Sequence, residues 1–321
     1  MKAPRVGLMV GYPGDGDALE RMVERSQWAE QQGFHFVVLG ERILWRQPHL
    51  DTFIAASAVF SHTQVLKMVC LLLVPVRHPV ITSKIITSLD QLSRGRLIIS
   101  PCIGGDYPHE YRNLGVPMQE RVGRTEEGLR IMRRLWSEPK VSYNGSYYRL
   151  DDVTAQPAPF QPGGPPLWLA HRGRAKASIK RAVELCDGWL AAWISPERFK
   201  RVQQMTVEYA HSISRDPATL TPAAIVRMVV ANSQEAAAQK AAKWRSMMYG
   251  HAQEPTLMQH LLPLGTPDDC AAHLKAFVDA GVTDLAISAA APEEDWEEQL
   301  HLFVTEVLPR AGIPLGLKER V

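Results

Sequence analysis

The sequence predicts an α/β protein whose fold is a (β/α)8 TIM barrel with insertions. Eight short apolar runs alternate with segments of helical period, and the alternation continues through all 321 residues without a second type of composition. The strand-like runs are continuously apolar, a pattern typical of parallel strands covered on both faces. An open, doubly wound sheet is the alternative. We expect a single domain over residues 1–321, with insertions at about 138–164 and 248–264.

The expected strands end at glycine, proline or polar residues, which mark the turns. In chain order they cover residues 6–10, 34–39, 65–74, 97–103, 165–170, 188–193, 223–231 and 285–288. Between the fourth and the fifth, Asn144 and Gly145 predict a hairpin, because Asn-Gly readily supplies the positive φ of a tight turn. A proline-rich loop over 156–166 follows that hairpin.

The expected helices lie between these strands and show one-sided apolar stripes or capping signals. Ile81, Ile85 and Leu89 recur every four residues, which places them on one face of a helix. Ser195 and Thr266 each precede a proline, the order of cap and first turn with which many helices begin. The expected helices cover 19–33, 53–60, 81–92, 120–136, 175–185, 266–278 and 296–307, with two more beginning at 195 and 233.

Charge and composition exclude several classes of protein. Lysine and arginine number 36 against 34 aspartates and glutamates, and the net charge of +2 favours neither nucleic acid nor a membrane surface as partner. The longest apolar run, 68–76, is far shorter than the roughly 20 residues of a membrane-spanning helix. Since the chain runs directly into a strand, we expect no secretory leader. Four separated cysteines predict buried free thiols in a cytoplasmic protein, and the scattered histidines predict no metal site.

Polar side chains follow two of the expected strands, where the chemistry of such a barrel takes place. Glu41 and Arg42 follow the second strand, while Asp106 and His109 follow the fourth. These groups could steer protons or hold a substrate, or they could form ion pairs that brace the loops. Asp106 is the better functional candidate, because the two glycines before it let a ligand approach the backbone.

The segment His171-Arg172-Gly173-Arg174 lies between an expected strand and an expected helix. Backbone amides at a helix start, with two arginines beside them, suit a phosphate. A solvated basic turn is the alternative reading. The glycine-rich segment 11–16 lacks the spacing of a phosphate-binding loop, and we expect it to cover the mouth of the barrel.

Several short stretches recur in an order and at separations that carry a family resemblance. They are 28–34 (WAEQQGF), 73–79 (LVPVRHP), 89–96 (LDQLSRGR), 163–169 (GGPPLWL) and 187–189 (DGW), together with Arg121, Arg124 and Glu127. Together they resemble the bacterial luciferase-like flavin oxidoreductase superfamily, over about residues 6–308.

The resemblance implies a barrel that binds reduced FMN, or the deazaflavin F420, at the C-terminal ends of its strands. The cofactor-binding residues that it implies are Leu71, Leu72, Gly104, Gly105, His171, Arg172, Gly173 and Arg174. The two leucines mark where members often have a non-proline cis peptide bond that backs the flavin ring. The first two glycines would lie alongside the ring, and the last four residues would hold the phosphate.

The sequence departs from the family after its second strand. Where many members have a histidine, this chain has Arg42, which stays protonated and cannot act as a general base. We expect Arg42 to stabilise a reduced, anionic flavin or substrate. Glu41 is a catalytic candidate beside it, and the alternative is that Glu41 only orients Arg42 as an ion pair. Asp106 is expected to handle protons or position the substrate, with His109 as the second candidate.

These residues and the resemblance together favour a two-component monooxygenase. A separate flavin reductase would supply reduced FMN, and O2 would then deliver one oxygen atom to a small organic substrate. An F420-dependent dehydrogenase or reductase, which moves a hydride without oxygen, is the alternative, and a flavin-binding protein without catalysis is a third hypothesis. Because family members often pair through helices two and three, we expect a homodimer, with the small-residue helix over 53–60 able to pack closely.

Overall fold

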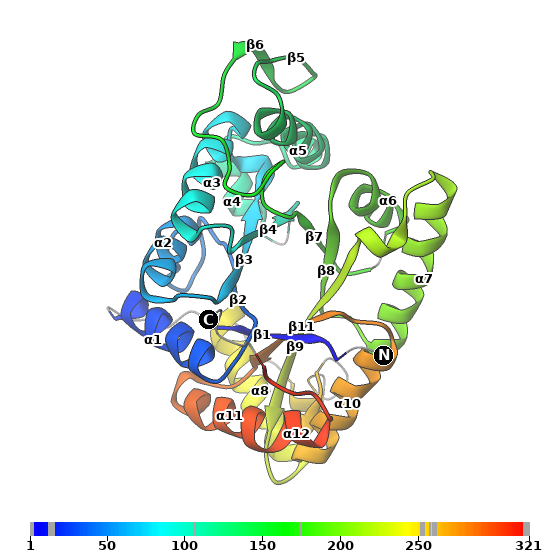
Figure 1. Ribbon diagram of the computed structural model, residues 1–321. Coiled ribbons are helices and arrows are strands. Elements are labelled where there is room, and N and C mark those ends of the chain that lie inside the picture. The colour runs from blue at the N-terminus through cyan, green and yellow to red at the C-terminus, as the bar shows by residue number, and fades with distance from the viewer. Residues whose placement is uncertain are drawn as a thin grey trace.

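In the computed structural model, eight parallel strands form a nearly closed barrel with helices around it (Figure 1). The structure describes residues 3–11, 17–105, 107–173, 175–250, 254–256, 258 and 262–316. The strands follow the order β4-β3-β2-β1-β11-β9-β8-β7, and a single parallel bridge between Ile99 and Leu167 joins the two edge strands. The predicted barrel is therefore confirmed.

The barrel strands lie close to the apolar runs that predicted them. They are β1 (Arg5–Met9), β2 (Phe36–Leu39), β3 (Lys67–Leu73), β4 (Leu97–Cys102), β7 (Trp168–His171), β8 (Gly188–Ala192), β9 (Thr221–Val230) and β11 (Asp284–Ala289). A ninth strand, β10 (Leu264–Gly265), pairs with the end of β9 outside the barrel.

The main helices follow the strands as the periodicity predicts. They are α1 (Ala18–Gln31), α2 (Thr52–His62), α3 (Pro79–Ser93), α4 (Pro108–Asn113), α5 (Arg121–Ser137), α6 (Lys176–Leu185), α7 (Pro196–Ser212), α8 (Gln234–Tyr249), α10 (Pro267–Asp279), α11 (Trp296–Leu302) and α12 (Leu308–Arg310). Ser195 and Thr266 cap α7 and α10 with their side chains, as predicted. No helix in the described ranges is long and apolar enough to cross a bilayer.

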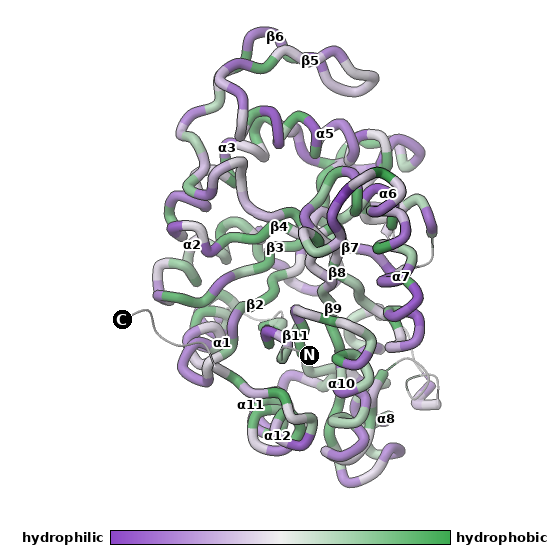
Figure 2. The backbone as a smooth tube through the Cα atoms, turned by 45° about the vertical axis from the view of Figure 1, so that its right-hand side comes forward, coloured by the Kyte–Doolittle hydropathy of each residue, from purple (hydrophilic) through white to green (hydrophobic). Residues whose placement is uncertain are grey.

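The strands separate two apolar layers. Val38, Val69 and Ile98 pack inside the barrel, whereas their neighbours Val37 and Met68 pack outward against the helices. Both faces of each strand are thus buried, which explains the continuous apolar runs. Figure 2 shows the hydrophobic strands at the centre and more hydrophilic segments on the surrounding helices.

The predicted hairpin stands outside the barrel, beyond α5 (Figure 1, Figure 2). It consists of β5 (Val141–Asn144) and β6 (Arg149–Val153), which pair antiparallel. The carboxylate of Glu127, on α5, accepts hydrogen bonds from the backbone amides of Ser146 and Tyr147 at 2.8 and 3.1 Å. Glu127 thus fixes this insertion onto the helix.

Candidate functional site

The C-terminal ends of the parallel strands meet at one rim of the barrel, here called the mouth. The loops after β2, β4 and β7 carry most of the polar residues expected to act in the site. A shallow cavity beside Arg5, Lys67 and Thr221 lies at the opposite end, where the strands begin. Because chemistry in this fold takes place at the C-terminal ends, the mouth is the candidate active site.

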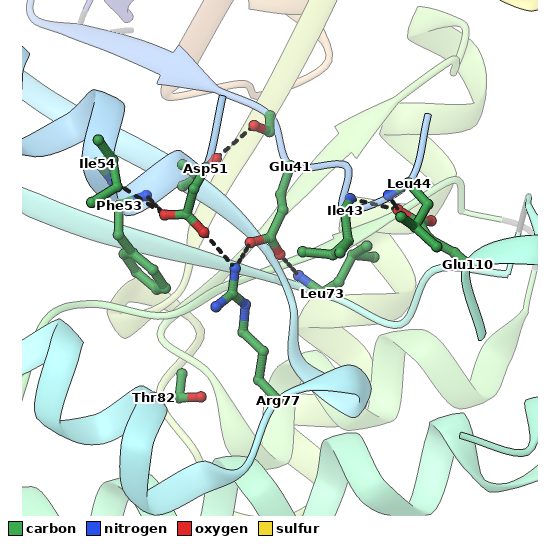
Figure 3. A network of polar contacts seen from close by, with 12 residues as sticks. Glu41, Ile43, Leu44, Asp51, Phe53, Ile54, Leu73, Arg77, Thr82 and Glu110 are labelled. Atoms are coloured by element: carbon green, nitrogen blue, oxygen red, sulfur yellow. Dashed lines mark hydrogen bonds and ion pairs between the residues drawn. The ribbon is translucent and has the colours of Figure 1, made fainter. Parts of the chain in front are cut away.

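Glu41 follows β2 and is buried in a polar network that joins three elements (Figure 3). Its carboxylate accepts hydrogen bonds from the backbone amide of Leu73, at the end of β3, and from the guanidinium of Arg77. Arg77 also donates to Asp51 at 3.0 Å, and Asp51 accepts from the first amides of α2. The network therefore ties the end of β2 to α2 and to the segment after β3.

These contacts correct the expectation that Glu41 orients Arg42. Glu41 pairs with Arg77 instead, because the chain after β2 turns the neighbouring side chains toward different partners. Burial raises the pKa of the Glu41 carboxyl, while Arg77 and the Leu73 amide favour its charged form. Both oxygens of this carboxylate already accept hydrogen bonds, so Glu41 stabilises the loops at the mouth.

Arg42 is held against the loop that follows β4. Its Nη1 lies 3.8 Å from the carboxylate of Glu110, and its guanidinium carbon lies 4.3 Å from the centroid of the Trp45 ring. Glu110 is buried and accepts hydrogen bonds from the amides of Ile43 and Leu44 at 2.6 and 3.1 Å (Figure 3). Glu110 therefore joins the loops after β2 and β4, a role that sequence spacing did not reveal.

The glycine pair after β4 is closely packed against side chains of the segments that follow it. Gly104 and Gly105 have φ angles of +68° and +108°, which favour glycine. A Cβ on Gly104 would lie 2.5 Å from the hydroxyl oxygen of Tyr111, so a side chain has no room there. His109, on α4, is exposed. Asp106 lies outside the described residues.

The two leucines of β3 face different layers. Leu71 packs against the cluster inside the barrel, whereas Leu72 is fully buried between the strands and the helices. Leu72 therefore cannot face a ligand inside the barrel. The peptide bond between them is trans. The cis peptide bond found among the described residues precedes Pro157, which corrects the expectation from the family.

The segment between β7 and α6 has backbone donors available to a ligand. Ala175 occupies the N-cap position of α6, and no described side chain caps the first amides of this helix. Gly173 has a φ of +63°, and a Cβ there would lie 2.8 Å from Val202. Arg172 is exposed beside the helix start. Arg174 lies outside the described residues.

His171 adds a buried donor to this segment. Its ring stacks on Trp189 with 5.2 Å between centroids, and burial lowers its pKa to about 4. The ring is therefore neutral at pH 7. Since Nδ1 accepts a hydrogen bond from the Gly173 amide at 2.9 Å, the proton resides on Nε2. Within the described ranges, this buried Nε2 has no hydrogen-bond partner, which costs free energy unless a ligand supplies one.

Sequence reasoning pointed to Arg42 but missed the group of aromatic and arginine side chains to which it belongs at the mouth. Its members, called the mouth wall below, are Arg42, Trp45, Trp193, Arg227, Arg245 and Tyr249. Two signals could have revealed it. Trp193 directly follows a strand, and Arg227 interrupts the apolar run of another.

Comparisons with known proteins agree with this architecture. The family model for luciferase-like monooxygenases matches residues 3–257. An FMNH2-dependent dimethylsulfone monooxygenase from Pseudomonas putida is 25% identical over 181 residues, which are 54% of this chain and 49% of that protein. The matched part of the chain thus spans about half the length of that relative.

Two further similarities extend over most of the chain. An F420-dependent hydroxymycolic acid dehydrogenase from Mycobacterium tuberculosis (strain ATCC 25618 / H37Rv) is 26% identical over 313 residues, covering 90% of this chain and 84% of that protein. The crystal structure of monooxygenase RslO1 from Streptomyces bottropensis superposes with a TM-score of 0.80 at 22% identity, covering 95% of this chain and 99% of the other. The superposition shows the shared barrel fold. The chain belongs to the luciferase-like monooxygenase family.

Proposed function

We propose that the protein is a flavin-dependent monooxygenase that acts on a small organic substrate with reduced FMN and O2. A separate flavin reductase would supply the reduced cofactor. Family membership supports a flavin-dependent oxidoreductase, and the dimethylsulfone monooxygenase relative favours oxygen chemistry. The hydroxymycolic acid dehydrogenase relative aligns over more of the chain and favours F420, so a test must include both cofactors.

The start of α6 is the observation that carries this proposal. Its first amides have no cap from a described side chain, and Arg172 supplies positive charge beside them. The Nε2–H of His171 is a buried donor still without a partner in the described part of the chain. Such donors fit the phosphate of a flavin mononucleotide. Arg174 belongs to the same proposed set.

The neighbouring side of the mouth, after β4, suits the flat ring of the cofactor. Gly104 and Gly105 place no side chain of their own beside the ring, and Leu71 offers an apolar surface from inside the barrel. Reduced FMN would supply the electrons with which O2 is activated. The remaining tasks, which are to hold charge, exclude water and move a proton, fall to the side chains of the chain itself.

Arg42 is assigned to electrostatic stabilisation. Its charge is permanent, and Glu110 and Trp45 fix its position, so it can stabilise negative charge on a reduced ring or on the substrate. We assign proton transfer or substrate positioning to Asp106. His109 is the second candidate, because its exposure to water leaves its position less restricted.

Anaerobic titrations with reduced FMN and with F420, followed by measurement of O2 consumption over a panel of substrates, test the proposal. Binding of reduced FMN with substrate-dependent O2 consumption is the expected result. Binding of F420 with hydride transfer and no O2 consumption would replace the monooxygenase by a dehydrogenase. Binding without turnover would favour a non-catalytic protein, and binding of neither cofactor would overturn the flavin proposal.

We also propose that the protein forms a homodimer through α2 and α3. Ile54 on α2 and Ile81 on α3 are 63% and 61% exposed, which is unusual for large apolar side chains. Light scattering should give twice the mass of the chain for the wild type. The double variant Ile54→Lys, Ile81→Lys should give the mass of a monomer, whereas a monomeric wild type would contradict the proposal.

A further inference from the structure

Trp193 has an unusual backbone conformation at the mouth. It directly follows β8 with a φ of +58°, a left-handed conformation that bulky residues adopt only where the surrounding structure enforces it. Ala192 packs toward the barrel interior, so strand alternation would direct Trp193 outward. The indole ring packs against the apolar cluster of α8 and the end of β9, and it also lies against a side chain from inside the barrel.

That side chain is Arg227 of β9. It comes two residues after Ile225, which packs in the barrel interior, and its Nη2 lies 3.3 Å from the sulfur of Met9 in the same cluster. The guanidinium carbons of Arg227 and Arg245 each lie 5.0 Å from the centroid of the Trp193 ring. The ring also stacks on Trp244 of α8, with 6.4 Å between the centroids, and is therefore fixed between β9 and α8.

The mouth wall continues from Trp193 toward the loop after β2. The guanidinium of Arg245 lies 4.6 Å from the ring of Tyr249, and that ring lies 5.9 Å from the ring of Trp45 at an angle of 86°. At the far end of the mouth wall, the guanidinium of Arg42 lies over the ring of Trp45. A continuous row of aromatic rings and guanidinium groups thus extends from the seventh barrel strand to the loop after the second.

The chemistry of the mouth wall favours a planar anion. Its charged members are arginines, which stay protonated at every pH at which the protein is folded. Guanidinium planes and aromatic faces both stack on flat groups, and the positive charge attracts an acidic substituent. Glu110 contacts the wall through Arg42, but its carboxylate is directed at two backbone amides.

We propose that the mouth wall is the substrate subsite and that Trp193 is its specificity-determining residue. The substrate class is a planar organic anion, such as an aromatic carboxylate. This inference rests on the proposed function, because it names the substrate class for the same mouth. The strained backbone holds the indole where Arg227 is within reach of an acid group bound against the ring.

Isothermal titration calorimetry at low ionic strength tests the substrate class with three probes. They are 4-hydroxybenzoate, which is planar and anionic, its methyl ester, which is planar and neutral, and cyclohexanecarboxylate, which is anionic but not planar. We expect the first to bind at least tenfold more tightly than either of the others. Equal affinity for the ester or for cyclohexanecarboxylate, or absence of measurable binding of 4-hydroxybenzoate, would overturn the proposal.

Two variants separate the contributions of charge and ring. Arg227→Met should weaken the affinity for both carboxylate probes, 4-hydroxybenzoate and cyclohexanecarboxylate, at least tenfold. In Trp193→Asn, the asparagine tolerates the left-handed backbone. This variant should lower the affinity for 4-hydroxybenzoate at least tenfold and the affinity for cyclohexanecarboxylate less than twofold. Lys180→Met is the control, because Lys180 lies 5.1 Å over the ring of Tyr209 on the outer helices. It should change each affinity less than twofold.

Cofactor titrations on the same wild-type protein distinguish failure of this inference from failure of the proposed function. Flavin binding without discrimination among the three probes contradicts the substrate class alone. Discrimination among the probes without binding of reduced FMN or F420 contradicts the flavin proposal and leaves the anion subsite supported. Unchanged affinity for 4-hydroxybenzoate in Trp193→Asn, with a wild-type thermal unfolding curve, would remove Trp193 from the subsite.

Discussion

Two charged regions at the mouth differ in how completely their polar atoms are satisfied. Beside β2 and β3, the carboxylates of Glu41 and Asp51 contact Arg77 and backbone amides. Between β7 and α6, by contrast, the helix begins without a cap from any described side chain, and the buried Nε2 of His171 has no partner within the same residues. The carboxylates of the first region have their partners without a ligand, although the Nε of Arg77 has none among the described residues, whereas the second region has donors at an uncapped helix start to offer a ligand.

Whether a buried polar group already has a partner distinguishes stabilising residues from binding residues better than the type of residue does. A buried ion pair whose lone pairs are all engaged contributes to the stability of its loops, and breaking it leaves an uncompensated charge. A buried donor without a partner is costly in the empty protein and becomes favourable when a ligand accepts its hydrogen bond. The variants below test this distinction in order of the expected effect.

The largest effect is expected for Glu41→Ala. The variant leaves the guanidinium of Arg77 without its buried partner, and we expect it to lower the free energy of unfolding by about 3–5 kcal/mol. Urea denaturation measures this loss. Lys140→Ala, which breaks an ion pair with Asp152 at the surface, is the control and should leave stability nearly unchanged. A stable Glu41→Ala protein that has lost turnover would make Glu41 catalytic instead.

The second effect is a pH dependence from His171. Its pKa is lowered to about 4 in the folded protein, against 6.5 for an exposed histidine. Between these values the unfolded chain binds the proton and the folded protein does not, so stability falls as the pH falls from 6.5 toward 4, by up to about 3 kcal/mol. Urea denaturation across this range should show a shallower slope for His171→Leu. Identical slopes would mean that His171 is not buried as described.

A smaller effect is expected for Arg172→Ala. Loss of one charged donor beside the proposed phosphate should weaken the affinity for reduced FMN by about tenfold, which corresponds to about 1.4 kcal/mol. Fluorescence titration at matched ionic strength measures it. Lys180→Ala removes a charge from the same helix, α6, but over the ring of Tyr209, and should change the affinity less than twofold. If the two variants lowered the affinity equally, Arg172 would contribute only long-range attraction through its charge and no contact with the phosphate.

The smallest effect is expected for His109→Ala. The imidazole is exposed, so water can take over much of any proton transfer that it performs, and turnover should fall no more than about threefold. Asp106→Ala should lower turnover more. Steady-state assays of both variants with reduced cofactor compare them, and a larger loss in His109→Ala would reverse the order of the two candidates.

The barrel could be predicted from the sequence because each strand is buried on both faces. Runs such as those around Val38 and Val69 leave no polar position that would allow a half-exposed sheet. The hairpin near Asn144 and Gly145 was predicted as well, but neither residue has the positive φ on which that prediction rested, because the turn extends over residues 145–148. The uncapped start of α6 was visible as well, in the alanine that occupies its cap position.

The partners of the site residues could not be predicted in this way. Glu41 and Arg42 are adjacent in sequence, yet they pair with Arg77 and Glu110, which are 36 and 68 residues away along the chain. The barrel brings such segments together through strand order, which spacing does not encode. The strained backbone of Trp193 was likewise invisible, because tertiary packing enforces it against the local preference.

The proposed flavin site depends most directly on a phosphate bound at the start of α6. Titration of the wild-type protein with FMN and with riboflavin, which differ by that phosphate alone, measures its contribution. We expect FMN to bind at least tenfold more tightly, and we expect the difference to shrink severalfold in the double variant Arg172→Ala, Arg174→Ala. Equal affinities for FMN and riboflavin in the wild type, or an undiminished difference in the double variant, would contradict the assignment of this segment as the phosphate site.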